Sequence, residues 1–444
     1  MKDDLEYHLD DPGDNIEIEK ANSKNKKVKN VLISIAIIEF IIIVIGIILF
    51  LTLGKKDSNK EKDSYKEQDS NKEQDFPEVY LYINISTSEN NMIKNSFKKG
   101  GENYKPEIGN LNNGNDYKVN ERDNFDLCIP KSVFQNKTNY QTIVLNIHGG
   151  GWMGGKKANV LETYKSGLFK NFILASMSYT ILNGNYKEYN IFRIIDEITA
   201  VLSTLKRFLI NKGFDGNKLE LIIQGGSAGA HLSLLYSYMI KNSPIPIKFI
   251  FNGVGPISVN PDDFLTTLPG SEPLEDIGPE EIKKAKIENR IIPMNGNETG
   301  VNMDNTYLMY FMNGWLGRPL NENFDKIFSN LEKKEINKSS EIYQEMLNKT
   351  SYAYPIRYVN KESIPTLCIY GGKDEEVGVA QYAKLKEAFL NNSNNNITLV
   401  YFKYGKHDPF YNATGDYGKN MMKKFSEELL KYCNKYLDSY KKNN

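Results

Sequence analysis

Short apolar runs alternate with helical patterns along most of this chain, from residue 78 onward. The apolar runs are rich in β-branched and aromatic residues, which is typical of strands. Eight strands are predicted, at Val79–Ile85, Asn124–Ile129, Thr142–Ile147, Phe172–Tyr179, Leu219–Gln224, Ile247–Gly253, Thr366–Tyr370 and Ile397–Phe402. Apolar residues at helical spacing predict helices at Tyr189–Asn211, Ala228–Lys241, Ala380–Leu390 and Met421–Tyr440. This alternation indicates an α/β fold on a mostly parallel sheet.

One stretch breaks the alternation. From about Ser258 to Tyr352 the chain carries proline, glycine and aromatic residues without a clear period. Loops this long in a compact domain are usually functional. We expect an insertion or lid at 258–352 within a domain that spans 78–444.

The N-terminal region has a different pattern. Val31–Leu53 is an almost unbroken apolar run whose only charge is Glu39, and it is long enough to cross a bilayer. We predict a transmembrane signal anchor here, after a short polar tail at residues 1–30. A cleaved signal peptide is the alternative, but its apolar core would be shorter and would end at a small-residue site, which is not evident.

A charged repeat follows the apolar run. From Asp57 the chain reads DSNKEK, DSYKEQ and DSNKEQ, with Tyr65 as the one apolar residue. Such a segment cannot bury a core, so we predict a solvated stalk at residues 54–77. Lysines flank the span on both sides and give no orientation. The short N-terminal stub and several N-x-[ST] sequons favour a single-pass protein with its large domain in the lumen or outside the cell.

Charge and cysteine content narrow the possibilities further. The chain has 56 Lys and Arg against 56 Asp and Glu, for a formal net charge of zero. It therefore lacks the basic field that nucleic-acid binding needs, and we expect no nucleic-acid partner. Two of its cysteines, Cys128 and Cys368, fall in predicted strands, and with Cys433 they favour buried thiols over a disulfide framework.

The sequence LELIIQGGSAGAHL passes from a predicted strand into a predicted helix at Ser227. A sharp strand-to-helix turn forces its central residue toward positive φ and brings neighbouring backbone into contact, so glycine or alanine is needed beside it. The G-x-S-x-G pattern in this context indicates a nucleophilic serine. A phosphate-binding loop is the alternative, but its lysine and its glycine spacing are missing.

A glycine-rich turn follows the strand Thr142–Ile147 in NIHGGGWMGG. Consecutive glycines let the main chain approach a reacting carbonyl closely, and amide donors stabilise the oxyanion that forms there. We predict that the amides of Gly150, Gly151 and Ala228 form an oxyanion hole. A merely flexible loop is the alternative for the glycines alone.

A serine nucleophile requires a base, and the chain has four histidines. His8 precedes the apolar span and His148 belongs to the glycine turn. His231 lies one helical turn after Ser227, where we expect it to pack along the helix. His407, just after the last predicted strand, is therefore the predicted base.

A carboxylate is expected to hold the imidazole in the correct tautomer. Strand Thr366–Tyr370 is followed by two glycines, Lys373 and the acids Asp374, Glu375 and Glu376. We choose Asp374 because it is the first carboxylate past the turn, and we expect the other two to face solvent. The order Ser, Asp, His along the chain is that of α/β-hydrolases.

Four segments together carry a family resemblance: VLNIHGGGWMGGKK, LIIQGGSAGAHLSLL, TLCIYGGKDEEV and KHDPF. They resemble the hormone-sensitive-lipase-like and carboxylesterase-like branch of the α/β-hydrolases. Within it, GGSAGAHL is most similar to feruloyl/acetyl-xylan esterase-like (BD-FAE-like) domains, kynurenine formamidases and isoprenylcysteine methylesterases. The resemblance implies an α/β-hydrolase fold with helices on both faces of its sheet and an acyl-enzyme mechanism without metal or cofactor. It implies the triad Ser227, Asp374 and His407.

The pattern leaves more than one function open. A membrane-anchored serine esterase acting on a small-molecule or carbohydrate-linked ester is favoured, because nucleophile, base and oxyanion glycines are all present. An arylformamidase-type amide hydrolase and a catalytically silent binding or adhesion ectodomain are the alternatives. The chain departs from many lipase-like relatives at Gly226, where they carry an acidic residue before the nucleophile.

Overall fold

A computed structural model of the chain describes residues 79–86, 124–165, 169, 171–182, 190–268, 270–293, 305–316, 324–330, 332, 335–410 and 415–441. The predicted tail, signal anchor and stalk, residues 1–77, lie outside these ranges. Among the helices within them, none is both long and apolar enough to cross a membrane.

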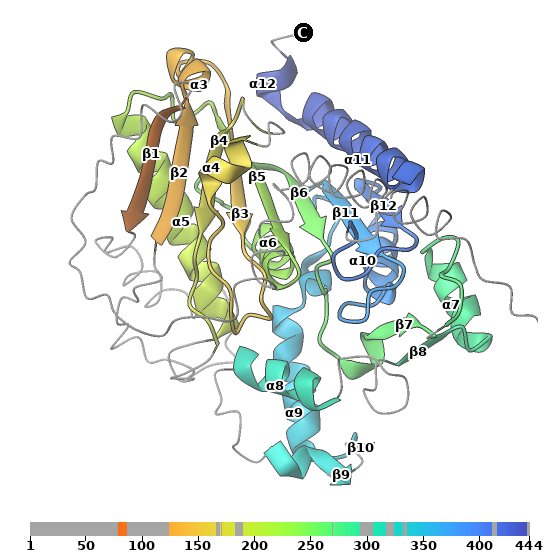
Figure 1. Cartoon of the computed structure of the whole chain (residues 1–444). Coiled ribbons are helices and arrows are strands. Elements are labelled where there is room, and N and C mark those ends of the chain that lie inside the picture. The colour runs from red at the N-terminus through yellow and green to blue at the C-terminus, as the bar shows by residue number, and fades with distance from the viewer. Residues whose placement is uncertain are drawn as a thin grey trace, which may run out of the picture.

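An eight-stranded sheet forms the centre of the molecule, in the order β1-β2-β4-β3-β5-β6-β11-β12 (Figure 1). Strand β2 pairs antiparallel with β1 and β4, and the other pairs in this sheet are parallel. The strands are β1 (Val79–Ser86), β2 (Asn124–Pro130), β3 (Gln141–Ile147), β4 (Ile173–Met177), β5 (Leu219–Gly226), β6 (Ile247–Gly253), β11 (Thr366–Gly371) and β12 (Ile397–Phe402). The predicted mostly parallel eight-stranded sheet is confirmed.

Helices cover both faces of this sheet, because successive strand residues point to opposite sides. On β3, Leu145 belongs to one apolar core and Val144 to the other. The first core includes residues of α5 (Ile191–Asn211), α6 (Ala228–Met239) and α10 (Ala380–Asn391), and the second includes residues of α4 (Val160–Lys165) and α11 (Gly415–Tyr436). The inner strands of the sheet are thus mostly buried on both faces, which explains their apolar runs.

Some boundaries differ from the prediction. The short helices α3 (Lys131–Gln135) and α4 were not predicted. The last predicted helix, Met421–Tyr440, instead begins at Gly415 and is followed by a separate short helix, α12 (Asp438–Lys441). Gly415 and Gly418 hide this helix start, because glycine disfavours a helix interior. Cys128, Cys368 and Cys433 are free and buried, as predicted.

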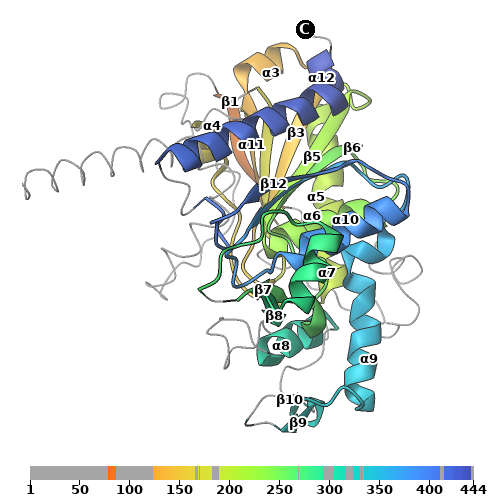
Figure 2. The ribbon, with the colours of Figure 1, turned by 90° about the vertical axis from the view of Figure 1, so that its right-hand side faces the viewer.

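Between β6 and β11 the chain forms further short elements, in the stretch where the sequence alternation breaks. They are β7 (Leu265–Thr267), α7 (Pro279–Ile287), β8 (Ile291–Pro293), α8 (Asn305–Trp315), β9 (Phe328–Asn330), β10 (Glu335–Ile336) and α9 (Glu341–Thr350). Figures 1 and 2 show them gathered below the central sheet, beyond the end of β6. This segment therefore lies beyond the carboxyl end of β6.

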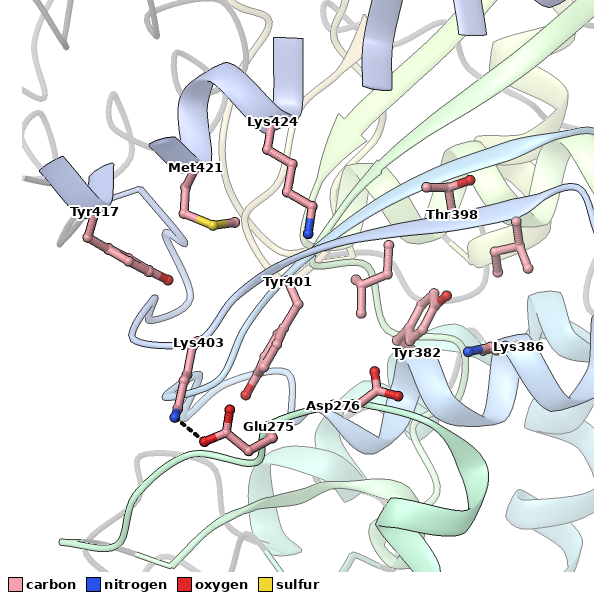
Figure 3. Close-up of a pocket in the computed structure, with 12 residues that line it drawn as sticks. Glu275, Asp276, Tyr382, Lys386, Thr398, Tyr401, Lys403, Tyr417, Met421 and Lys424 are labelled. Carbon is pink, nitrogen blue, oxygen red and sulfur yellow. Dashed lines mark hydrogen bonds and ion pairs between the residues drawn. The ribbon is translucent and has the colours of Figure 1, made fainter. Parts of the chain in front are cut away.

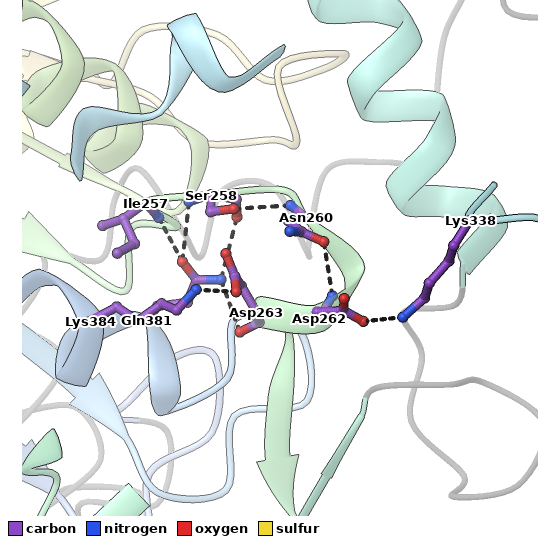
Figure 4. A network of polar contacts seen from close by, with 8 residues as sticks. All are labelled: Ile257, Ser258, Asn260, Asp262, Asp263, Lys338, Gln381 and Lys384. Atoms are coloured by element: carbon purple, nitrogen blue, oxygen red, sulfur yellow. Dashed lines mark hydrogen bonds and ion pairs between the residues drawn. The ribbon is translucent and has the colours of Figure 1, made fainter. Parts of the chain in front are cut away.

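A buried glutamine on α10 holds the start of this segment in place (Figure 4). The Gln381 side-chain oxygen accepts hydrogen bonds from the backbone amides of Ile257 at 2.8 Å and Ser258 at 3.2 Å. Its amide nitrogen donates to the carbonyls of Ser258 and Asp263, each at 3.3 Å. Lys384, on the same helix, pairs with the Asp263 carboxylate. Because the Gln381 side chain is fully buried, these bonds fix the segment to the main fold.

Candidate active site

Ser227 occupies the sharp turn between β5 and α6 in a strained conformation. Its φ is 52° and its ψ is −122°, a backbone region that few non-glycine residues adopt. Its amide donates to the carbonyl of Gly253 at 2.8 Å, and its side chain caps no helix amide. A Cβ at Gly229 would lie 2.0 Å from the carbonyl oxygen of Ile147, so this turn can close only on glycine. The strain holds the Ser227 hydroxyl clear of helix hydrogen bonding.

The glycine turn after β3 packs against this serine. A Cβ at Gly149 would stand 2.8 Å from the carbonyl oxygen of Gly226 and 3.4 Å from Cβ of Ser227. Gly150 and Gly151 have φ of 108° and 57°, which favours glycine at both positions. Within the described ranges, neither of their amides donates a hydrogen bond. The turn thus brings two unpaired amide donors into the neighbourhood of Ser227.

His148 and His231 pack in and around the glycine turn. His148 stacks on Tyr179, with ring centroids 4.0 Å apart. His231 is fully buried, where its Nε2 lies 2.9 Å from the carbonyl oxygen of Ala353 and its Nδ1 accepts from the Trp152 indole at 3.2 Å. Burial lowers the pKa of His231 to about 3. Both of its ring nitrogens are therefore engaged in the interior, as expected for a packing role.

Asp374 and His407 face each other at the ends of β11 and β12. The Nδ1 atom of His407 lies 3.0 Å from Oδ2 and 3.2 Å from Oδ1 of Asp374. Asp374 Oδ1 also accepts from the amides of Glu376 and Val377, both at 2.8 Å. The Asp374 side chain is fully buried, whereas that of His407 is 15% exposed. This geometry suits a carboxylate that orients an imidazole.

The turn and the loop that carry these residues pack tightly together. A Cβ at Gly371 would lie 2.3 Å from the carbonyl oxygen of Lys406, and the Lys373 amide donates to the carbonyl of Gly405 at 2.8 Å. Glycine at position 371 is therefore required for His407 to approach Asp374.

Strand β7 also supports the Asp374 turn, from the segment between β6 and β11. The Thr266 hydroxyl donates to the carbonyl of Asp374 at 2.9 Å, and the Thr267 hydroxyl donates to that of Gly372 at 3.0 Å. A Cβ at Gly378 would lie 1.7 Å from the carbonyl oxygen of Leu265, so the two backbones touch. Sequence reasoning missed these threonines, because nothing in their local pattern indicates a distant partner.

Three charged groups act on the imidazole of His407. Burial lowers its pKa, but the charge and hydrogen bond of Asp374, with the charges of Glu376 and Asp408, outweigh burial and raise the pKa to about 9. The Glu376 side chain is 53% exposed, yet its Oε2 lies 3.5 Å from Nε2 of His407. Glu376 is exposed, as expected, and its carboxylate also lies beside the His407 ring. Among the described residues, His407 forms its side-chain hydrogen bonds with Asp374. No hydrogen bond between Ser227 and His407 is found among these residues.

The parallel sheet brings these groups to one edge. Gly226 pairs with Gly253 between β5 and β6, Gly253 pairs with Ile369 between β6 and β11, and Gly371 pairs with Phe402 between β11 and β12. The residues that follow these strands, Ser227 and Asp374 among them, therefore emerge at the same end of the sheet, where open α/β sheets bind their ligands.

A groove of about 500 Å³ lies elsewhere, along the outer edge of β12 (Figure 3). Its lining includes Tyr382, Tyr401, Tyr417, Lys386, Lys403 and Lys424. Lys403 pairs with Glu275 at 2.5 Å. None of the predicted catalytic or oxyanion residues lines this groove.

Comparison with solved structures gives distant likenesses. A truncated carbohydrate esterase from gut microbiota is 18% identical, with a TM-score of 0.42 over 69% of this chain and 90% of that one. Esterase B from Lactobacillus rhamnosis is 15% identical, with a TM-score of 0.40 over 72% and 84%. A hyperthermophilic esterase from the archaeon Pyrobaculum calidifontis is 14% identical, with a TM-score of 0.40 over 69% and 80%. A comparison with curated proteins gives no match.

The family comparison covers part of the chain. Residues 125–252 match the BD-FAE family model. This range holds Ser227 and the glycine turn, whereas Asp374 and His407 lie beyond it. The match agrees with the resemblance that the sequence motifs carry. Residues 125–252, which run from β2 to β6 and include the Ser227 turn, are thus similar to BD-FAE domains.

Proposed function

We propose that this chain is a serine esterase that cleaves carboxylic esters through an acyl-enzyme on Ser227. The observation that carries the proposal is the strained Ser227, with φ of 52°, beside a glycine turn whose Gly150 and Gly151 amides have no acceptor among the described residues. A hydroxyl held next to free amide donors supplies a nucleophile and a place for the charge that its attack creates.

In this proposal each group has one task. His407 Nε2 accepts the proton of Ser227 as the serine oxygen attacks the ester carbonyl, while Asp374 holds the proton on Nδ1. The carbonyl oxygen becomes an anion and accepts hydrogen bonds from the amides of Gly150, Gly151 and Ala228. Ala228 is the first residue of α6, so the helix dipole adds to this stabilisation.

Collapse of the intermediate completes the cycle. His407 donates its proton to the departing alcohol, which leaves the acyl group on Ser227. Water then attacks the acyl-enzyme, with His407 again accepting a proton, and releases the acid. The substrate in this proposal is a small-molecule or carbohydrate-linked ester, and no metal or cofactor takes part.

We also propose that the enzyme is anchored in a membrane by a single N-terminal helix. The support is the apolar run Val31–Leu53, followed by the charged repeats of residues 54–77. A chain that begins at Asp75 is expected to leave the membrane fraction and to keep its activity. If it stays in the membrane, another anchor exists. A glycosidase-sensitive mass on the full-length chain is expected if the domain lies in the lumen or outside the cell.

Hydrolysis assays test the proposed activity. Substrates are p-nitrophenyl acetate, butyrate and octanoate, with feruloyl and acetyl-xylan esters and an aryl formamide. We expect ester hydrolysis that Ser227→Ala reduces by about 10³-fold or more, with an unchanged circular dichroism spectrum. Ser237→Ala, on the same helix, is the control and keeps its activity. Preference for the formamide would favour the amide hydrolase, and no turnover by a folded protein would favour the binding ectodomain.

A further inference from the structure

The turn after β11 places two carboxylates on opposite sides of one imidazole. Asp374 meets Nδ1 of His407 at 3.0 Å, and Glu376 meets Nε2 at 3.5 Å. The Glu376 amide donates to Asp374 Oδ1, so the backbone of the turn couples the two acids. Glu375, between them, is exposed and makes no ion pair or hydrogen bond with any described residue. The contact with Nε2 is therefore particular to Glu376.

Nε2 is the atom that the proposed mechanism uses. When His407 is neutral and donates from Nδ1 to Asp374, Nε2 carries a lone pair that points toward the negative Glu376 carboxylate, which is repulsive. When His407 is protonated, Nε2 carries a hydrogen that this carboxylate attracts. The same contact thus favours the imidazolium, which cannot accept a proton from Ser227.

We propose that Glu376 is a positioning residue that holds His407 as an imidazolium between two carboxylates and so sets the pH range in which the site works. The inference rests on the proposed function, since it assigns His407 as the base. The charged groups that act on His407 are Asp374 and Glu376 on the turn after β11 and Asp408 on its own loop. Asp374 is needed to hold the proton on Nδ1, whereas Glu376 is not. Removing the Glu376 charge therefore makes the neutral, proton-accepting form of His407 more populated.

The size of the effect follows from the exposure of Glu376. Because the Glu376 side chain is 53% exposed, water screens its charge. At 3.5 Å and near the dielectric constant of water, Coulomb's law gives an attraction between Glu376 and protonated His407 that corresponds to a pKa change of about one unit. Glu376→Gln is therefore expected to lower the apparent pKa of His407 by about one pH unit. This raises kcat/KM at pH 7 by about tenfold, because the fraction of neutral His407 rises by that factor.

Two measurements on the full-length chain test the inference. The first is kcat/KM for p-nitrophenyl acetate from pH 6 to pH 10, for the wild type, Glu376→Gln and the matched control Glu375→Gln. The second is the pH dependence of His407 modification by diethyl pyrocarbonate, read by peptide mass spectrometry, because the reagent acylates only the neutral ring. We expect Glu376→Gln to move both midpoints to lower pH and Glu375→Gln to move neither.

The outcomes separate this inference from the proposed function. If the modification midpoint shifts but no variant hydrolyses esters, the contact between Glu376 and His407 holds while the proposed esterase fails. If the esterase is active and Glu376→Gln overlays the wild type and Glu375→Gln in both measurements, the inference is overturned. A loss of activity at pH 7 in Glu376→Gln with an unmoved midpoint overturns it as well.

Discussion

Replacing Asp374 with asparagine changes the proposed triad at one atom. Oδ1 of Asp374 accepts hydrogen bonds from the amides of Glu376 and Val377, both at 2.8 Å, while Oδ2 lies 3.0 Å from Nδ1 of His407. An asparagine keeps the two backbone bonds only if its oxygen takes the Oδ1 position. Its NH₂ group then faces His407 and donates to Nδ1. The ring proton must move to Nε2, which can no longer accept from Ser227.

The magnitude follows from the cost of escaping this arrangement. To restore the productive tautomer, the side-chain amide must flip and leave the backbone amides of Glu376 and Val377 without an acceptor, at about 1–3 kcal/mol each. The total of about 2–6 kcal/mol corresponds to a fall in kcat of about 30-fold to 10⁴-fold. The upper part of this range is expected, because asparagine also lacks the charge that stabilises the imidazolium. KM is expected to change little, since the Asp374 side chain is fully buried and pairs with His407.

Steady-state kinetics with p-nitrophenyl acetate measure this effect. Glu375→Gln is the control, because it removes the neighbouring exposed carboxylate and is expected to leave kcat within about twofold. Circular dichroism establishes that the Asp374→Asn protein is folded. If the folded Asp374→Asn protein keeps more than a tenth of the wild-type kcat, Asp374 does not orient the base and the reasoning from its hydrogen bonds fails.

Four further predictions follow from the described contacts. With the pKa of His407 raised to about 9, kcat/KM is expected to rise about tenfold per pH unit from pH 7 to pH 8 and to level off above pH 10, whereas a midpoint near 6.5 contradicts the ion pair. Because the pKa of His407 is higher in the folded protein, the ion pair adds to the free energy of unfolding below about pH 6.5, and this contribution is lost as the pH rises through 9. Urea unfolding at several pH values measures this change. Gly149→Ala would place its Cβ 2.8 Å from the carbonyl oxygen of Gly226, so the turn must move and kcat falls by about 10²-fold with an unchanged fold; unchanged kinetics would separate this turn from the reaction. His231→Leu strands the Trp152 indole and lowers the free energy of unfolding by about 1–3 kcal/mol, while kcat of the folded protein stays within about tenfold; a complete loss would return His231 to the list of bases.

The sequence predicted the strands well because both faces of this sheet are buried. The inner strands then read as largely apolar runs, and glycine marks the end of some of them, as at Gly253 and Gly371. The position of Ser227 was also predictable, since the close approach of Ile147 to Gly229 leaves room for glycine alone. These features are local in sequence and therefore visible in it.

What the sequence missed depends on contacts between distant segments. Glu376 belongs to a run of three acids that is usual for a solvated surface, and its role near His407 appears only when the loop after β12 folds over it. Thr266 likewise supports the Asp374 turn from a three-residue strand whose pattern is too short to read. Local pattern carries no information about either partner.

Covalent labelling of Ser227 tests the central claim most directly. The full-length chain is treated with a fluorophosphonate, which reacts with activated serines, and the modified residue is identified by peptide mass spectrometry. The account predicts one adduct, on the peptide that contains Ser227, which is absent from Ser227→Ala and retained in Ser237→Ala. Labelling that persists in a folded Ser227→Ala protein, or a folded wild-type protein that takes up no label, would contradict it.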